Sequence, residues 1–224
     1  MPTAQAVIDK SIEVSGTNFF TNQEVSFTFR DKEYTSIPME QGFKLQRKFI
    51  KDSVEIKEIK HKNTLSHFEN NVLVKLSDSL ISLHANSINS VHYFSRLPYG
   101  LNDSAVQKKM LGIVFFNNEE YYKIQITFSK EGGGDDFDDV YIYWFNVQTY
   151  LPDFLAYSFT VNGGGNRFRI AYNERYVNGI RFVDYKNYKT IDNKYPIQDI
   201  DKLYNTKELE FLSKIELKDI KVPN

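Results

Sequence analysis

Alternation of apolar and polar residues is the feature of this chain that most limits its fold. The segment YYKIQITFS (121–129) alternates aromatic or aliphatic residues with mostly polar ones, and so do EVSFTFR (24–30) and GFKLQRKFI (42–50). A period of two is typical of a strand with one buried face. Further segments follow at intervals of about a dozen residues, separated by turn residues, so we predict about ten antiparallel strands.

The segment VYIYWFNV (140–147) differs from the others because it is apolar or aromatic on both faces. Such a strand is covered on both sides, or lines a cavity with one of them. Aromatic residues make up 15% of the chain, with Phe 18, Tyr 15 and Trp 1. Because Tyr and Phe favour strands and large apolar surfaces, we expect a mainly β (α+β) fold: a curved antiparallel sheet or half-barrel.

Two helical parts are expected beside the strands. AQAVIDKSIEVS (4–15) has a broad apolar helical face, and Gly16 is a typical residue to end it. Residues 84–110 break the alternation, which predicts a helical insertion at about 86–110 that acts as a lid, with its second helix ending at Met110. No linker or charge block divides the chain, so we predict a single domain over 1–224.

Composition excludes several classes of protein. The chain has no cysteine, so disulfides and thiolate chemistry are absent. Its net charge of −1 argues against nucleic acid as a partner. No apolar run is long enough for a transmembrane helix. The opening MPTAQAVIDK lacks the features of a signal peptide, so we expect either a cytoplasmic protein or a mature sequence with an added start Met.

Two glycine triplets, in EGGGDDFDD (131–139) and VNGGGNRF (161–168), lie between predicted strands. The first is followed by four carboxylates, which are the kind of ligand that calcium prefers, but their spacing does not match a calcium loop. A hairpin tip is the favoured interpretation, and Arg167 and Arg169 after the second triplet would complement its charge. The weak metal candidates are Asp135, Asp136, Asp138 and Asp139.

No catalytic signature is present. The chain has no G-x-S-x-G motif and no HExxH motif, and no pair of carboxylates is marked out. The histidines are separated by six or more residues, which suits a scattered surface set: His61, His67, His84 and His92. We therefore predict no catalytic residue, no metal site and no cofactor, and favour a protein that is not an enzyme.

The aromatic residues are the remaining functional signal. Each of them is explained singly as part of the core, but together they favour a concave pocket lined by aromatic rings. The candidates come from the predicted lid and from the later strands, with one arginine beside them. The predicted ligand-binding residues are Tyr93, Phe94, Tyr99, Trp144, Tyr157, Phe168, Tyr172 and Arg169.

The order of elements resembles the lipoprotein-localisation factor (LolA/LolB-like) superfamily, and within it an uncharacterised group of bacterial lipoprotein-like proteins. The stretches that carry the resemblance are SVHYFSRLPYGLND, DDVYIYWFNVQTYLPDFLAYSF and GNRFRIAYNERYVNGIRFVDY. YWFNVQTYLP is similar to the W-x-D-x-x-T-x-L-P hairpin of lipoprotein-sorting proteins, with Asn146 where Asp is usual. The resemblance implies an incomplete β-barrel whose apolar concavity suits acyl chains.

The resulting hypothesis is a periplasmic or outer-membrane lipoprotein-type protein that buries an acyl chain or lipid beneath the lid. An N-terminal lipid anchor missing from this chain would attach it to the membrane periphery. The alternative is an enzyme or carbohydrate-binding protein with an aromatic, arginine-lined cleft, and a third reading is a structural envelope protein. A pocket lined by carbon would favour the first, and convergent polar groups with perturbed pKa values the second.

Overall fold

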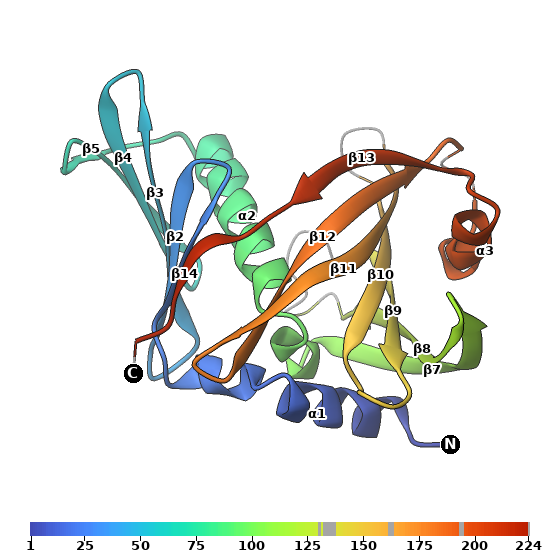
Figure 1. The fold of residues 1–224 in the computed structure, drawn as a ribbon. Helices are drawn as coiled ribbons and strands as arrows, with labels where there is room; N and C mark the ends of the chain where they lie inside the picture. Colours follow the sequence, from blue (N-terminus) through green and yellow to red (C-terminus); the bar gives the residue numbers. More distant parts are fainter. Residues whose placement is uncertain (130, 132–137, 161–163, 193–194, 224) are drawn as a thin grey trace. The chain divides into compact units, whose positions relative to one another are not determined.

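The protein is mainly β, with two seven-stranded antiparallel sheets, an N-terminal helix and an inserted helix. The computed structural model describes residues 1–129, 131, 138–160, 164–192 and 195–223 (Figure 1). The mainly β fold with an N-terminal and an inserted helix is confirmed. The division of the strands into two sheets was not predicted.

The first sheet has the order β14-β1-β2-β3-β4-β5-β6. Its strands are β1 (Val25–Phe29), β2 (Lys32–Pro38), β3 (Phe43–Lys51), β4 (Val54–His61), β5 (Thr64–Glu69), β6 (Val72–Val74) and β14 (Lys218–Lys221). The second sheet has the order β13-β12-β11-β10-β9-β8-β7. Its strands are β7 (Val106–Phe116), β8 (Glu119–Phe128), β9 (Val140–Asn146), β10 (Pro152–Phe159), β11 (Gly165–Val177), β12 (Ile180–Thr190) and β13 (Leu209–Ile215).

The chain forms two compact units. Unit 1 comprises Met1–Gly16, Pro98–Glu174 and Val183–Ile215, and unit 2 comprises Thr17–Leu97, Arg175–Phe182 and Glu216–Asn224. Unit 1 therefore holds most of the second sheet, and unit 2 holds the first. Each unit has its own buried apolar side chains. The expectation of a single domain over 1–224 stays a prediction.

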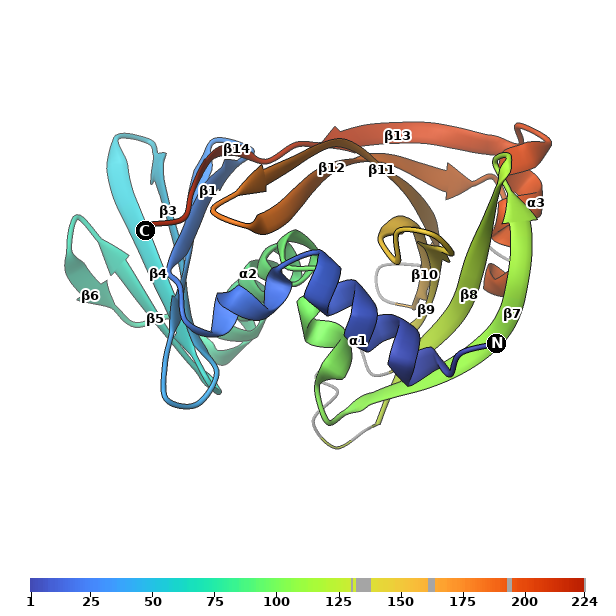
Figure 2. The same cartoon turned by 60° about the horizontal axis from the view of Figure 1, so that its bottom comes forward.

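In unit 1, α1 (Ala4–Val14) forms where the sequence predicts it. Thr3 caps the helix by accepting a hydrogen bond from the amide of Ala6, and Gly16 follows its end with a φ of 66°. The 3-10 turn η2 (Tyr99–Asn102) is tied to this helix, because Asn102 donates to Asp9 at 2.7 Å. Figure 2 shows the second sheet curving, with α1 along its concave side.

In unit 2, α2 (Asp78–Ser95) packs on β3 and β5, and a three-residue connection, residues 75–77, joins it to β6. Ser77 caps it by accepting a hydrogen bond from the amide of Leu80. Its buried face includes Ile88, Val91 and Phe94. The 3-10 turn η1 (Thr17–Thr21) precedes β1 and buries Phe20.

The inserted helix lies earlier in the chain than expected, and the second helix predicted up to Met110 is wrong. Residues 106–116 form β7 instead, pairing with β8 from Val106↔Phe128 to Phe116↔Glu119. The local sequence QKKM (107–110) does not alternate between apolar and polar residues, so it does not predict a strand. Its pairing with β8 is what makes it part of a strand. The remaining helical segments are η4 (Ile197–Asp199) and α3 (Ile200–Asn205).

Candidate functional site

Strand β9 is buried on both faces from Ile142 to Phe145, which is one of the two alternatives that its sequence leaves open. On one face of the second sheet, Ile197 of η4 and Ile200 of α3 pack against β7 to β11, and we call it the α3 face. The opposite face carries Val106, Lys108 and Met110 of β7, which lie against the start of α1. We call this opposite face the α1 face.

A row of aromatic rings runs along the α1 face. Tyr141 of β9 lies opposite Tyr157 of β10, and their rings stack at 5.3 Å. Phe128 of β8 contacts Tyr141 at 5.7 Å, and Phe159 contacts Tyr157 at 6.0 Å. The row continues along β9 through Tyr143, whose ring lies 6.4 Å from that of Tyr141. We call the complete set the aromatic row: Phe128, Tyr141, Tyr143, Phe145, Tyr157 and Phe159.

Exposure changes along the aromatic row. Tyr143 and Phe145 are 0% exposed, so they belong to the core of the protein. The other four residues are only partly buried, and we call them the outer rings: Phe128, Tyr141, Tyr157 and Phe159. Three adjacent strands therefore present a half-exposed apolar surface that continues directly into the core.

Two arginines of β11 lie over the outer rings. Arg169 donates from Nη2 to the hydroxyl oxygen of Tyr157 at 3.1 Å, and its guanidinium carbon lies 5.1 Å from the ring centroid. The guanidinium of Arg167 lies 4.7 Å from the ring centroid of Phe159. Both contacts follow from the β10–β11 register, in which Tyr157 opposes Arg167 and Leu155 opposes Arg169. The outer rings thus combine apolar surface with positive charge.

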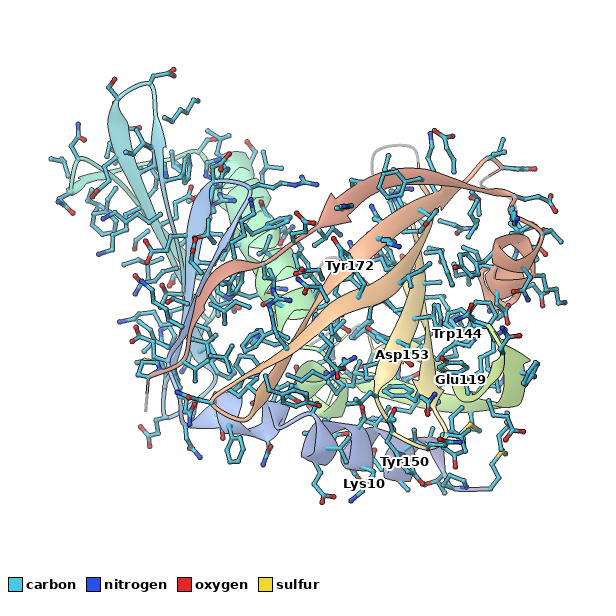
Figure 3. The ribbon with its side chains drawn as sticks, viewed as in Figure 1. Lys10, Glu119, Trp144, Tyr150, Asp153 and Tyr172 are labelled. Carbon is cyan, nitrogen blue, oxygen red and sulfur yellow. The ribbon has the colours of Figure 1, made fainter. Side chains whose placement is uncertain are left out.

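Trp144 and Phe168 lie on the α3 face, opposite the aromatic row. Their rings meet edge to face at 5.7 Å, in a core cluster that includes Phe116 and Phe154. Tyr204 of α3 covers Phe168 at 5.3 Å. These contacts make Trp144 and Phe168 core residues of unit 1. Tyr172 (Figure 3) lies four residues after Phe168 on β11, so the two side chains share the α3 face. The Nζ of Lys186 lies 5.8 Å from the centroid of its ring.

The predicted binding residues of the lid are divided between the units. Tyr93 and Phe94 belong to α2 in unit 2, where Phe94 packs edge to face on Phe29 at 5.5 Å. Tyr99 lies in η2 of unit 1. Of the predicted ligand-binding residues, the structure thus brings only Tyr157 and Arg169 together on the α1 face. The others lie on the α3 face, in α2 or in η2. Their role in ligand binding, and that of the helical segment as a lid, stay predictions.

Sequence reasoning missed Phe128 and Tyr141 as members of this surface. Both stand in alternating segments, and alternation does show which residues of one strand share a face. It does not show which strands are neighbours, and the β8–β9 and β9–β10 registers supply that information.

A polar cluster lies at one end of β8, β9 and β10 (Figure 3). The hydroxyl of Tyr121 donates to Asp153 at 3.3 Å, and the side-chain amide of Asn146 donates to Glu119. Burial, and then the charge of Asp153, raise the pKa of the Tyr121 phenol. The phenol therefore stays protonated and serves as a hydrogen-bond donor rather than as a base.

The acidic hairpin tip is described only in part. Asp135 and Asp136 lie outside the described residues, whereas Asp138 is exposed and Asp139 is buried. A tip whose charge is complemented by Arg167 and Arg169 stays a prediction. Among the described residues, the group with metal-ligand geometry is a different one: Glu58, His67 and His84.

The expectation of scattered surface histidines is wrong for three of the four. His67 and His92 are buried, and His84 meets His67 at the carboxylate of Glu58. Spacing along the chain did not reveal this group, because its members come from three different elements.

An open groove of about 500 Å³ lies between the first turn of α1 and β7 on the α1 face. Thr3, Gln5 and Lys108 line it together with Ala4, Val106 and Met110, so its wall mixes polar and apolar groups. No helix among the described residues is long and apolar enough to cross a membrane.

Comparisons with known proteins identify both a family and a fold. A model described as "Family of unknown function (DUF6503)" matches residues 2–217. A LolA superfamily protein from Nitrosomonas europaea has a similar structure, with a TM-score of 0.57 at 12% identity, covering 100% of this chain and 95% of that one. A DUF1329 family protein from Desulfovibrio piger gives a TM-score of 0.52 at 8% identity, covering 99% and 93%. No curated protein sequence matches the chain.

Proposed function

The chain belongs to the DUF6503 family of unknown function and has a LolA-like fold, and on this basis we propose that it binds an acyl chain or a lipid without catalysing a reaction. The proposal includes a place in the bacterial periplasm or outer envelope, with peripheral association with the membrane. Fold likeness alone does not establish a function, so the proposal depends on the chemistry of one surface.

The observation that supports it is the half-exposed end of the aromatic row. An acyl chain laid against the outer rings would remove apolar surface from water, at about 0.8 kcal/mol for each buried CH₂. The rings need no new partner to be ordered, because they already contact one another with centroids 5.3 to 6.0 Å apart. Arg167 and Arg169 lie where the anionic head of a fatty acid or phospholipid would meet positive charge.

A carbohydrate is the second candidate ligand, because aromatic rings beside hydrogen-bond donors also suit a sugar. The Tyr157 hydroxyl and the Arg169 guanidinium provide such donors. The two candidates differ in what they require of Tyr157: a lipid uses its ring, and a sugar also uses its hydroxyl.

The test combines native mass spectrometry with ligand titration. Protein purified from cells should carry fatty acid or phospholipid, and the delipidated protein should bind a fluorescent long-chain fatty acid. Tyr157→Ala should weaken that binding about tenfold or more, because it removes a ring from the surface. Tyr172→Ala is the matched control, since Tyr172 shares the α3 face with Phe168, and its binding should equal that of the wild type.

Tyr157→Phe separates the two ligands. It should leave fatty-acid binding nearly unchanged, whereas a sugar ligand would lose a hydrogen bond and about tenfold or more in affinity. Failure of the wild type to carry or bind any lipid would overturn the proposal. So would equal losses from Tyr157→Ala and Tyr172→Ala.

A further inference from the structure

Unit 2 contains a buried group of ionisable side chains that the lipid-binding proposal does not use. Arg47, Glu58 and His67 are cross-strand neighbours on β3, β4 and β5, with Arg47 opposite Glu58 and Glu58 opposite His67. They therefore share one face of the first sheet. α2 lies on this sheet and adds His84 to the group.

Glu58 is the centre of the group, and its side chain is 0% exposed. Its Oε2 accepts from Nε of Arg47 at 2.7 Å and lies 2.5 Å from Nη2 of the same guanidinium. Its Oε1 lies 3.0 Å from Nδ1 of His67 and 2.5 Å from Nδ1 of His84. One carboxylate oxygen is thus held by the arginine, and the other is shared by two imidazole rings.

We propose that Glu58, His67 and His84 bind a divalent transition-metal ion, with Zn²⁺ as the best match. The three ligand atoms, one from each residue, lie within 4.8 Å of one another. Two imidazole nitrogens and one carboxylate oxygen form a ligand set that zinc accepts, with a fourth position left for water. The ion would connect α2 to β4 and β5.

The surroundings of the three ligands support the assignment. A histidine that binds a metal usually donates its other ring N–H to a carboxylate, and Nε2 of His67 lies 3.5 Å from Oε1 of Glu69. The Arg47 guanidinium binds Oε2 of Glu58, so Oε1 is the oxygen that faces both histidines.

The ligand atoms, which lie within 4.8 Å of one another, must move to hold an ion. Bonds of about 2.0–2.2 Å in a tetrahedral site place ligand atoms roughly 3.3 Å apart. Oε1 and Nδ1 of His67 are already 3.0 Å apart, so most of the movement falls on His84, which is 2.5 Å from Oε1. The side chain of His84 is 27% exposed, which gives it room to move and gives the ion a route of entry.

Two features oppose binding. The positive charge of Arg47 repels a cation, and both rings must carry their proton on Nε2 instead of Nδ1. In His67, that tautomer donates toward Glu69. The charge of Glu69 also offsets part of the charge of the ion.

The test is calorimetric titration of ZnCl₂ into protein freed of metal by a chelator and of any affinity tag. We expect one Zn²⁺ per chain, and Co²⁺ in its place should give the intense visible absorption of a tetrahedral site. His84→Ala should weaken zinc binding roughly 100-fold or more, because it removes a ligand, whereas Glu69→Gln should weaken it about tenfold.

His61→Ala is the matched control, because His61 is the histidine at the turn between β4 and β5 and lies outside the group. It should bind zinc as the wild type does. The proposal is overturned if the wild type binds no zinc, or if His84→Ala and His61→Ala bind it equally. Because His84 is partly exposed, its replacement leaves the fold intact, and far-ultraviolet circular dichroism verifies this.

Discussion

His92 lies in α2 beside the rings of Phe27 and Tyr34, at centroid distances of 5.9 and 5.7 Å. Its Nε2 donates to the carbonyl oxygen of Gln46 at 3.3 Å. Burial, followed by the charge of Arg96, lowers the pKa of His92 from 6.5 to about 3. The folded protein therefore keeps this ring neutral, whereas the unfolded chain takes up a proton as the pH falls below 6.5.

This difference predicts how stability changes with pH. The stability contributed by a neutral His92 is complete above 6.5 and is lost as the pH falls from 6.5 towards 3. The loss between about pH 7.5 and pH 5 amounts to about 2 kcal/mol. His92→Phe removes the titrating ring, so the variant should not lose this stability. The free energy of unfolding of the wild type minus that of the variant should therefore fall by that amount on acidification. A difference independent of pH would contradict the prediction.

Asn146 explains a departure from the lipoprotein-sorting hairpin pattern. Its Oδ1 accepts from the amides of Gln148 and Thr149 at 2.9 and 3.1 Å, which forms the turn between β9 and β10. An aspartate would accept the same two bonds. Only an amide also donates to Glu119, as the Nδ2 of Asn146 does.

Asn146→Asp should therefore place two carboxylates in contact and destabilise the protein by about 1–2 kcal/mol at neutral pH. The additional change Glu119→Gln supplies a new donor and should restore most of the loss. Urea unfolding of the single and double variants measures both effects. A single variant as stable as the wild type would show that the contact with Glu119 contributes nothing.

At the scale of elements, β7 contains an irregularity that depends on one glycine. The register with β8 shifts between Met110 and Gly112, and Gly112 has a φ of 127°. A Cβ at this position would meet no atom within 4 Å beyond its chain neighbours, so the cost of an alanine here comes from the backbone alone. This makes the site a clean measure of backbone strain.

Gly112→Ala should cost about 2–3 kcal/mol, because an L-residue adopts this φ only under strain. Gly42→Ala is the control: Gly42 also has open space around it, but its φ of 75° lies near the ordinary left-handed region. Its replacement should cost only about 1 kcal/mol. Thermal unfolding compares the two, and equal costs would contradict the strain argument.

At the scale of the whole molecule, the family model and the LolA superfamily structure both extend over nearly the full chain. The fold shared with that structure therefore includes both units. The two proposals fall in different units, with the aromatic row in unit 1 and the Glu58 group in unit 2. Each can fail without affecting the other, since no residue belongs to both.

Local patterns in the sequence were sufficient for the main features of the fold. Alternation identified most strands, and the apolar face before Gly16 identified α1. The two-sided apolar pattern of 140–147 limited β9 to a strand that is covered on both faces or lines a cavity with one of them. These features depend only on residues close together in the chain.

Tertiary structure alone decided which strands are neighbours, and with that the functional surfaces. The pairing of β14 with β1 joins Lys221 to Ser26, and the pairing with β8 makes 106–116 a strand. The tertiary structure also placed Trp144 and Tyr157 on opposite faces of the second sheet and brought His84 into contact with Glu58. Period and propensity describe each segment by itself, whereas the partners of a segment are chosen by packing between residues far apart in sequence.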